Sequence, residues 1–180
     1  KLNGGYQQKS KRREKVKEPI EHFWKIRLAK VKKNLEANNF EVFLATDINE
    51  AKTIVLEQIV PSCMPKTISY GGSMTVKAVG LHDTDGELEG ITLVRPDGPD
   101  LSFEKKIELR RQGLIADLYF SGSNAVTEDG ELVNLDMIGN RVAAITFGPK
   151  NVVILVGRNK IVPDLESAMY RIKDYAAPVN

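Results

Sequence analysis

The sequence predicts an α/β domain with a mostly parallel sheet and helices on both faces. Three observations support this fold class. Short apolar segments alternate along the chain with segments of helical periodicity. The segment 151–156 reads NVVILV, and such a continuous apolar run is typical of a strand in a parallel sheet. Loops rich in Gly, Ser or Asn directly follow several of the apolar segments, as in sheets that bind ligands at their strand ends.

In the first half of the chain, the elements are predicted by apolar spacing and by the residues at their ends. Pro19 suits the first turn of a helix, and the apolar residues after it recur every three or four positions. Asp47 is a good N-cap, and Pro61 is expected to end the helix that Asp47 begins. We expect a helix at 19–38, a strand at 41–45, a helix at 48–60, a strand at 66–70 and a helix from Ser73 to about residue 81.

The second half continues the alternation of strands and helices. Asp129-Gly130 indicates a tight reversal between two short strands. The segment 151–156 is the most continuously apolar one, so we expect it to be central in the sheet and covered on both faces. The elements expected here are strands at 91–94, 117–120, 125–127, 131–135 and 151–156, with helices at about 103–114, 139–147 and 163–172.

Length and composition fit one folded domain with a short tail. The 180 residues are 42% hydrophobic and 28% charged, which excludes a mostly disordered chain. Cys63 is the single cysteine, so this chain by itself forms no intrachain disulfide, cysteine-ligated iron–sulfur cluster or zinc ribbon. No apolar run approaches the roughly 18 residues of a membrane span, and the start lacks a secretory pattern. We expect a cytoplasmic protein with no metal site, no cofactor in this chain and no membrane partner.

The net charge of +2 hides an uneven distribution. Residues 1–33 contain 12 Lys and Arg against three Glu, whereas the remaining residues contain 14 Lys and Arg against 21 acids. The densest basic block, Lys9 to Lys17, would suit nucleic acid because clustered cations release phosphate counterions. So short a block beside an acidic body is, however, typical of a solvated tail. We expect a basic tail at 1–18, a domain at 19–180 and no nucleic-acid partner.

Ligands of open parallel sheets bind beyond the carboxyl ends of the strands, and the first candidate loop follows the strand at 66–70. Gly71 and Gly72 let the backbone turn sharply, and Ser73 can cap the next helix. The free N–H groups of that first turn, with the hydroxyl of Thr75, would suit a phosphate or carboxylate. The motif is neither a P-loop nor a complete GxGxxG, and an ordinary glycine turn with a serine cap explains it equally well.

The second candidate loop follows the strand at 117–120. Small polar side chains directly after a buried strand are costly to bury unless their hydrogen bonds are used. Ser121, Ser123 and Asn124 are therefore candidate ligand contacts. Asn134, after the reversal, belongs to the same group.

Further candidates lie in the next two loops. Asn140 and Arg141 begin a helix and offer N–H groups and a guanidinium to an anion, although an ion pair with Asp136 on the surface explains Arg141 as well. Lys160, after the strand at 151–156, either reaches the same site or is solvated. Replacing Asn124 or Arg141 by Ala should abolish ligand binding with little change in melting temperature.

Four ordered segments resemble the LUD-domain family of lactate-utilisation proteins, which includes the LutB and LutC types. They are GGSMT at 71–75, SGSNAVTEDGELVN at 121–134, GNRVA at 139–143 and NKIV at 159–162, and the likeness spans roughly residues 19–180. The resemblance implies the fold shared by ribose-phosphate isomerases, glucosamine-phosphate deaminases and CoA transferases (NagB/RpiA/CoA-transferase-like). LutB-type members carry cysteine-rich cluster segments that this sequence lacks, so the chain is more similar to LutC or to a free-standing LUD protein.

The resemblance also implies a role in oxidising lactate to pyruvate within an assembly that contains iron–sulfur clusters. This chain would be a non-redox subunit or accessory protein that binds a small anionic ligand and docks on an iron–sulfur protein partner. The alternative is a stand-alone isomerase-like or transferase-like enzyme acting on a phosphorylated or CoA-linked metabolite. The acid used by the isomerases corresponds to Asn124, and because an amide transfers no proton at neutral pH, isomerisation there is not expected. Turnover and homo-oligomer formation stay open.

Overall fold

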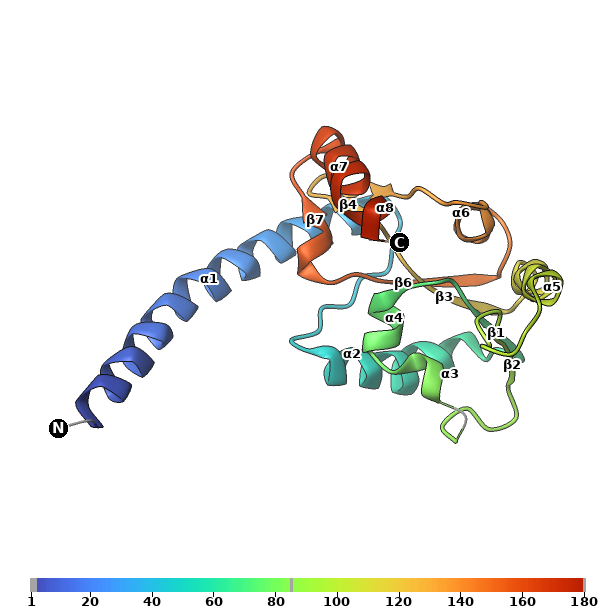
Figure 1. The fold of residues 1–180 in the computed structure, drawn as a ribbon, viewed down its shortest axis with the longest axis horizontal. Helices are drawn as coiled ribbons and strands as arrows, with labels where there is room; N and C mark the ends of the chain where they lie inside the picture. Colours follow the sequence, from blue (N-terminus) through green and yellow to red (C-terminus); the bar gives the residue numbers. More distant parts are fainter. Residues whose placement is uncertain (1–2, 85, 180) are drawn as a thin grey trace.

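The computed structural model describes residues 3–84 and 86–179, with side chains described from residue 18 to residue 178 within these ranges. A four-stranded parallel sheet forms its centre, and the strand order is β2-β1-β3-β6. Helices lie on both faces of this sheet (Figure 1), so the predicted fold class is confirmed. The strands are β1 (Thr67–Tyr70), β2 (Thr92–Val94), β3 (Leu118–Gly122) and β6 (Asn151–Leu155).

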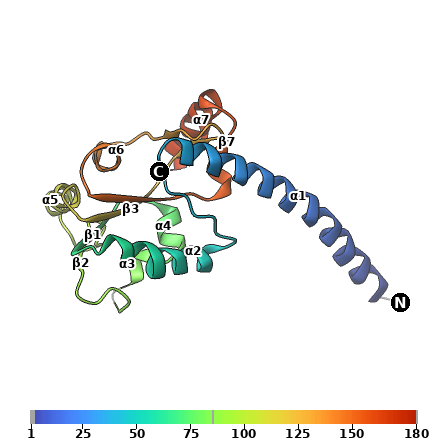
Figure 2. The ribbon, with the colours of Figure 1, turned by 180° about the vertical axis from the view of Figure 1, so that it is seen from behind.

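Two groups of helices cover the two faces of the central sheet (Figures 1 and 2). One face carries α2 (Ile48–Ile54), α3 (Val60–Cys63) and α4 (Met74–Ala78). The other face carries α5 (Phe103–Gly113) and α6 (Asn140–Thr146). A π-helical turn, η1 (Val55–Ile59), joins α2 to α3, and short 3-10 turns follow α4 and β6, namely η2 (Leu81–Asp83) and η3 (Arg158–Lys160).

A smaller sheet of three strands lies beside the central one. Its order is β5-β4-β7, with β4 antiparallel to β5 and parallel to β7. The reversal predicted at Asp129-Gly130 joins β4 to β5, and Gly130 has a φ of 87°. The elements of this region are β4 (Ala125–Thr127), β5 (Leu132–Val133), β7 (Ile161–Val162), α1 (Asn3–Ala37), α7 (Leu165–Arg171), the π-helical turn η4 (Ile172–Ala176) and α8 (Ala177–Val179).

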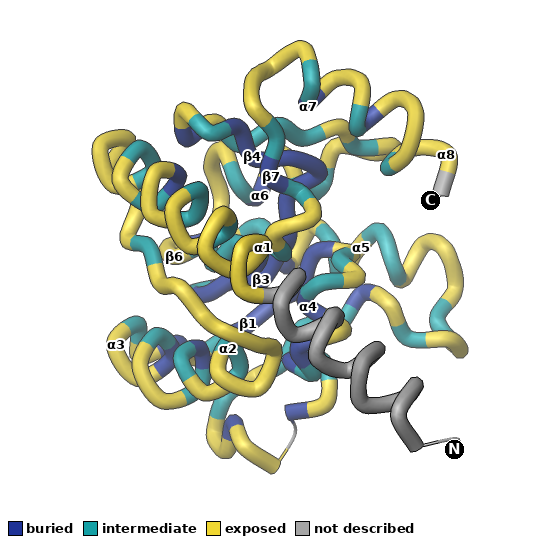
Figure 3. Tube along the Cα trace, turned by 90° about the vertical axis from the view of Figure 1, so that its left-hand side faces the viewer, coloured by how far each residue is buried: buried dark blue, intermediate teal, exposed yellow. Residues whose placement is uncertain are grey.

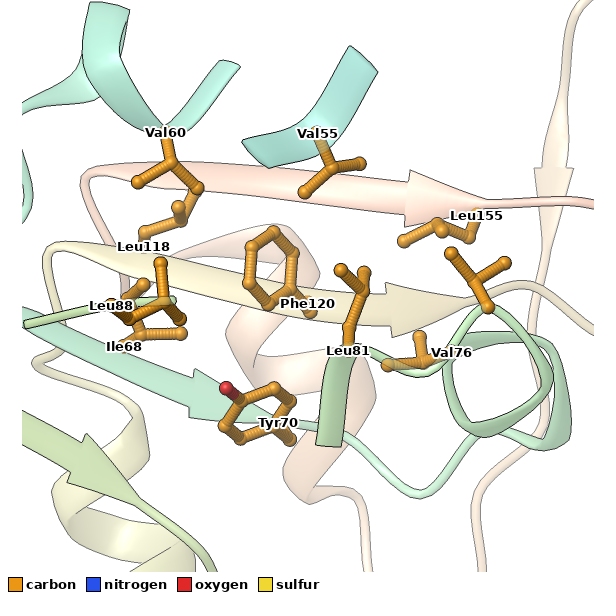
Figure 4. Close-up of a cluster of buried hydrophobic side chains, with 11 residues drawn as sticks. Val55, Val60, Ile68, Tyr70, Val76, Leu81, Leu88, Leu118, Phe120 and Leu155 are labelled. Atoms are coloured by element: carbon orange, nitrogen blue, oxygen red, sulfur yellow. The ribbon is translucent and has the colours of Figure 1, made fainter. Parts of the chain in front are cut away.

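The main hydrophobic core lies between the central sheet and the helices on the face that carries α2, α3 and α4. Leu118 and Phe120 are two residues apart on β3, so their side chains lie on the same face of the sheet. They form the core with Ile68 of β1, and all three side chains are fully buried. Val55 and Val60 close the cluster from the helical side (Figure 4). Figure 3 shows that buried residues concentrate in the strands, whereas the outer sides of the helices are exposed.

The helix predicted to begin at Pro19 begins at Asn3, so the predicted start is wrong. Pro19 lies inside α1, although an interior proline costs about 3 kcal/mol through its lost hydrogen bond and its clash with the preceding turn. The residues before it are rich in Lys, Arg, Glu and Gln, which have high helix propensity. Figures 1 and 2 show the N-terminal part of α1 projecting away from the rest of the protein. The separation of a tail at 1–18 from a domain at 19–180 stays a prediction.

Two further predictions about the first half are wrong. Residues 41–45 form no strand, because no neighbouring strand in the described part of the chain pairs with them. Pro61 does not end its helix, which continues through α3 to Cys63 and stops at Met64, with a φ of 43°. The preceding π-helical turn, closed by the bond from Val60 N to Val55 O, shifts the hydrogen-bond pattern and accommodates the proline.

The strand at 151–156 is also placed differently from the prediction. β6 lies at the edge of the central sheet and pairs only with β3. Within the central sheet, the interior strand β3 is the one whose residues are all buried, although it carries Ser121 and Gly122. The apolar sequence of β6 therefore indicated that it faces the core, which it does through Val153 and Leu155. It did not indicate the position of β6 in the sheet.

Candidate functional site

The loops that follow β1, β3 and β6 lie together at the carboxyl edge of the central sheet, because these three strands are parallel neighbours. The three loops approach one another most closely at Gly122. A Cβ atom placed on Gly122 would lie 2.5 Å from Ser73 Oγ and 3.3 Å from Lys160 Nζ. The three loops predicted to converge therefore do so. We call the group formed by Ser73, Gly122 and Lys160 the sheet-edge site.

The glycine loop after β1 packs closely against β3. Gly71 N donates to Phe120 O at 2.8 Å, and a Cβ atom on Gly71 would lie 2.8 Å from Ser121 Oγ and 2.9 Å from the Tyr119 hydroxyl. Gly72, in contrast, is exposed and has open space around it. Close packing, more than turn geometry, therefore requires the first glycine.

Ser73 has the capping role that the sequence predicted. Its hydroxyl accepts a hydrogen bond from Val76 N at 3.3 Å and begins α4. Thr75 lies in the first turn of α4 and is partly buried. The hydroxyl of Ser73 keeps the second lone pair and its proton for a further partner.

The hydroxyls of the second loop are used inside the protein. Ser121 donates to Gly122 O at 3.2 Å, and Ser123 donates to Ala125 O at 2.8 Å. Both serines are fully buried. They satisfy the main chain where β3 ends and β4 begins, which removes the cost of burying them.

Arg141 is the centre of a polar network beside this loop. Its Nε donates to Asp136 Oδ1 at 2.8 Å, and its Nη2 donates to Asn124 Oδ1 at 2.5 Å. Asn124 Oδ1 also accepts from Leu135 N at 3.0 Å. The Arg141 and Asp136 side chains are only 12% and 10% exposed. The ion pair considered as the alternative for Arg141 is therefore present, but it is nearly buried and not on the surface.

The two remaining asparagines also make contacts within the protein. Asn134 Oδ1 accepts a hydrogen bond from Asn124 N at 3.4 Å. The Asn140 side chain is hydrogen-bonded with the Tyr119 hydroxyl, and burial, followed by the charge of Asp136, raises the pKa of Tyr119 to about 12. Tyr119 is thus a neutral hydrogen-bonding group next to the glycine loop at physiological pH.

Lys160 and Arg171 differ from Arg141 in having no acidic partner among the described residues. Within the part of the chain that the structure describes, the Lys160 ammonium has no ion pair and no hydrogen bond. Burial, with the charges of Arg171 and Arg141, lowers the pKa of Lys160 to about 8. Arg171 Nε is buried without a hydrogen-bond partner, and its guanidinium lies 5.2 Å from the centre of the Tyr175 ring. Lys160 and Arg171 influence each other's charge, and neither is paired with an acid among the described residues, so together they produce a region of positive potential.

Sequence reasoning missed part of this arrangement. It left Lys160 undecided and did not select Tyr119, Gly122 or Arg171. Tyr119 is an aromatic residue inside a strand, which predicts a core residue, and Gly122 is a glycine at a strand end, which predicts a turn. Arg171 has no local signal, because α7 approaches the site only through tertiary packing.

The described residues contain neither a candidate metal-ligand cluster nor a candidate membrane-spanning helix. Among residues 3–84 and 86–179, no group of three or more His, Cys, Asp or Glu side chains is placed to hold a metal ion. In the same described ranges, every helix is too short or too polar to cross a lipid bilayer.

Comparison with known families identifies the domain. The family profile described as LUD domain matches residues 28–180. The chain belongs to the LUD-domain family. Searches of curated proteins and of solved structures return no match. The match begins inside α1 and includes all of the central sheet, the smaller sheet and the sheet-edge site of this LUD domain.

Proposed function

We propose that this LUD domain is a non-redox subunit or accessory protein of lactate oxidation and binds a small carboxylate anion at the sheet-edge site. The observation that carries the proposal is the Lys160 amine, which lies beside Gly122 and Ser73, feels the charge of Arg171, and has no acidic partner in the described chain. Membership in a family related to lactate utilisation supports the choice of lactate or pyruvate. In this proposal the protein is located in the cytoplasm, which is a reducing compartment.

Electrostatics favours an anion at this position. A unit charge about 4 Å from a cation gains roughly 4 kcal/mol at the effective dielectric typical near a protein surface. An anion between Lys160 and Arg171 would also relieve their mutual repulsion. Ser73 would add a hydrogen bond from its hydroxyl, since the capping contact uses that oxygen as an acceptor.

Asn124, Asn134, Asn140 and Arg141 have a supporting part in this proposal. Their side chains contact other protein groups, and the network holds the second loop in place next to Gly122. Free amide hydrogens of the asparagines remain available to a ligand.

Binding is tested by isothermal titration calorimetry with lactate, pyruvate, inorganic phosphate and coenzyme A, each titrated separately. We expect the two carboxylates to bind the wild type, and Lys160→Met to weaken their binding at least tenfold. Lys105→Met is the matched control, because Lys105 is an exposed lysine on α5, and its affinity should equal that of the wild type. Binding of phosphate or coenzyme A alone would favour the alternative enzyme on a phosphorylated or CoA-linked metabolite. Absence of binding by all four compounds would refute the anion site.

The proposal includes docking on an iron–sulfur protein. The loop before α6 exposes three apolar side chains that a partner would cover, namely Leu135, Met137 and Ile138, which are 54%, 97% and 46% exposed. Met137→Asp should reduce co-purification with the iron–sulfur protein, and Phe103→Asp on α5 is the control at another exposed apolar residue. If lactate oxidation persists without this chain, and Met137→Asp still co-purifies with the iron–sulfur protein, the partner role is wrong.

A further inference from the structure

Lys160 occupies an unusual position for a lysine. It ends η3, the turn through which the chain passes from β6 of the central sheet to β7 of the smaller sheet. Its Nζ would lie 3.3 Å from a Cβ atom on Gly122, which would itself lie 2.5 Å from Ser73 Oγ. The amine therefore faces into the sheet-edge site, partly buried, and not into bulk water.

The groups that surround this amine disfavour its protonated form. α7 contributes the charge of Arg171, and α6 contributes that of Arg141, which is paired with Asp136. From β3 and α4 the neighbours are Gly122 and Ser73, which carry no charge. Burial and nearby cations are the two conditions that keep a lysine amine neutral and nucleophilic near physiological pH.

We propose that Lys160 forms an imine with the carbonyl carbon of a small 2-oxo acid bound at the sheet-edge site. This inference rests on the proposed anion site and adds covalent chemistry to it. The neutral amine adds to the carbonyl carbon to give a carbinolamine. The carbonyl oxygen and the two amine protons then leave as water, and a carbon–nitrogen double bond remains. No electron is transferred to or from the substrate, so the step needs no oxidant or reductant.

The substrate class follows from the groups that the site offers. Arg171 can attract the carboxylate, and Lys160 requires an electrophilic carbon next to it. A 2-oxo acid such as pyruvate has both features, whereas a 2-hydroxy acid such as lactate has the carboxylate but no carbonyl. Lactate is therefore a built-in negative control for the covalent step.

The fraction of neutral amine supports selective reaction at this residue. A pKa of about 8 for Lys160 leaves about one tenth of its amines neutral at pH 7. An ordinary lysine is neutral in roughly one molecule in 2,500 at that pH. The neutral fraction, and with it the rate of trapping, should rise as pH rises through about 8 and then level off.

The test is reductive trapping of pyruvate with sodium borohydride, followed by intact-protein and peptide mass spectrometry. We expect a mass gain of one pyruvic acid less one oxygen atom, on the peptide that contains Lys160. The peptide must be located, because the N-terminal amine also titrates near pH 8. Lactate with borohydride should give no adduct.

Two variants separate the covalent step from binding. Lys160→Arg keeps the positive charge, so it should retain pyruvate binding by calorimetry and lose the adduct. Lys105→Met should keep both. If wild-type protein binds pyruvate but is not labelled at Lys160, or is labelled mainly at the N-terminus, the imine is wrong and the anion site stands. If pyruvate neither binds nor labels but lactate binds, the imine is wrong and the anion site stands; if none of the four compounds binds, both fail. Circular dichroism of Lys160→Arg checks its fold, and the wild-type peptide map decides the proposal without that variant.

Discussion

Replacing Arg141 by Ala should lower the free energy of unfolding by about 3–5 kcal/mol. This is the usual cost of removing one partner of a buried ion pair. The truncation leaves Asp136, which is 10% exposed, with a backbone bond from Val142 N as its remaining contact. It also removes one of the two donors to Asn124 Oδ1 and the side-chain donor to Leu135 O. In a protein of this size the melting temperature should fall by about 6–20 °C. This differs from the expectation based on sequence, in which the melting temperature hardly changed.

Urea unfolding followed by circular dichroism measures the effect. Arg158→Ala is the matched control, because Arg158 pairs with Glu21 on the surface, where the two side chains are 49% and 64% exposed. That control should cost less than about 1 kcal/mol. The double variant Asp136→Ala/Arg141→Ala should lose less than the sum of the two single losses, because it leaves no buried charge unpaired. Equal losses for Arg141→Ala and Arg158→Ala would refute the structural role assigned to this network.

Three further predictions use the same unfolding assay. Gly71→Ala should cost about 1–3 kcal/mol through overpacking against β3, whereas Gly72→Ala, which has open space around it, should change little. Leu118→Ala in the fully buried core should cost about 2–5 kcal/mol, and Leu135→Ala, at 54% exposure, should cost far less. Hydrogen bonds from Lys150 and from the main chain hold the pKa of Asp117 well below its ordinary value of 3.8. Its contribution is therefore present above about pH 4 and is lost as pH falls below that, so wild type should lose its advantage over Asp117→Asn in acid. An advantage that persists unchanged at low pH would contradict this.

Local patterns were sufficient for much of the fold. The N-caps Asp47 and Ser73 were predicted because a short polar side chain before a helical segment satisfies free N–H groups. The reversal at Gly130 was predicted because Asp-Gly tolerates left-handed backbone conformations. The family followed from four ordered segments, which lie within the matched range.

Features that depend on neighbours were not predictable in this way. The segment 41–45 has strand propensity but no strand beside it, and β6 is apolar yet lies at an edge.

The sequence by itself determined the alternation of strands and helices, and thus the edge at which three loops meet, because parallel strands end on the same side. Only the tertiary structure decided the roles of the polar residues there. Asn124 and Arg141 bond to each other, whereas Lys160 and Arg171 lack acidic partners in the described chain. Hydrogen bonding and desolvation depend on atoms that are distant in sequence, so residue type and spacing cannot report which charges are neutralised.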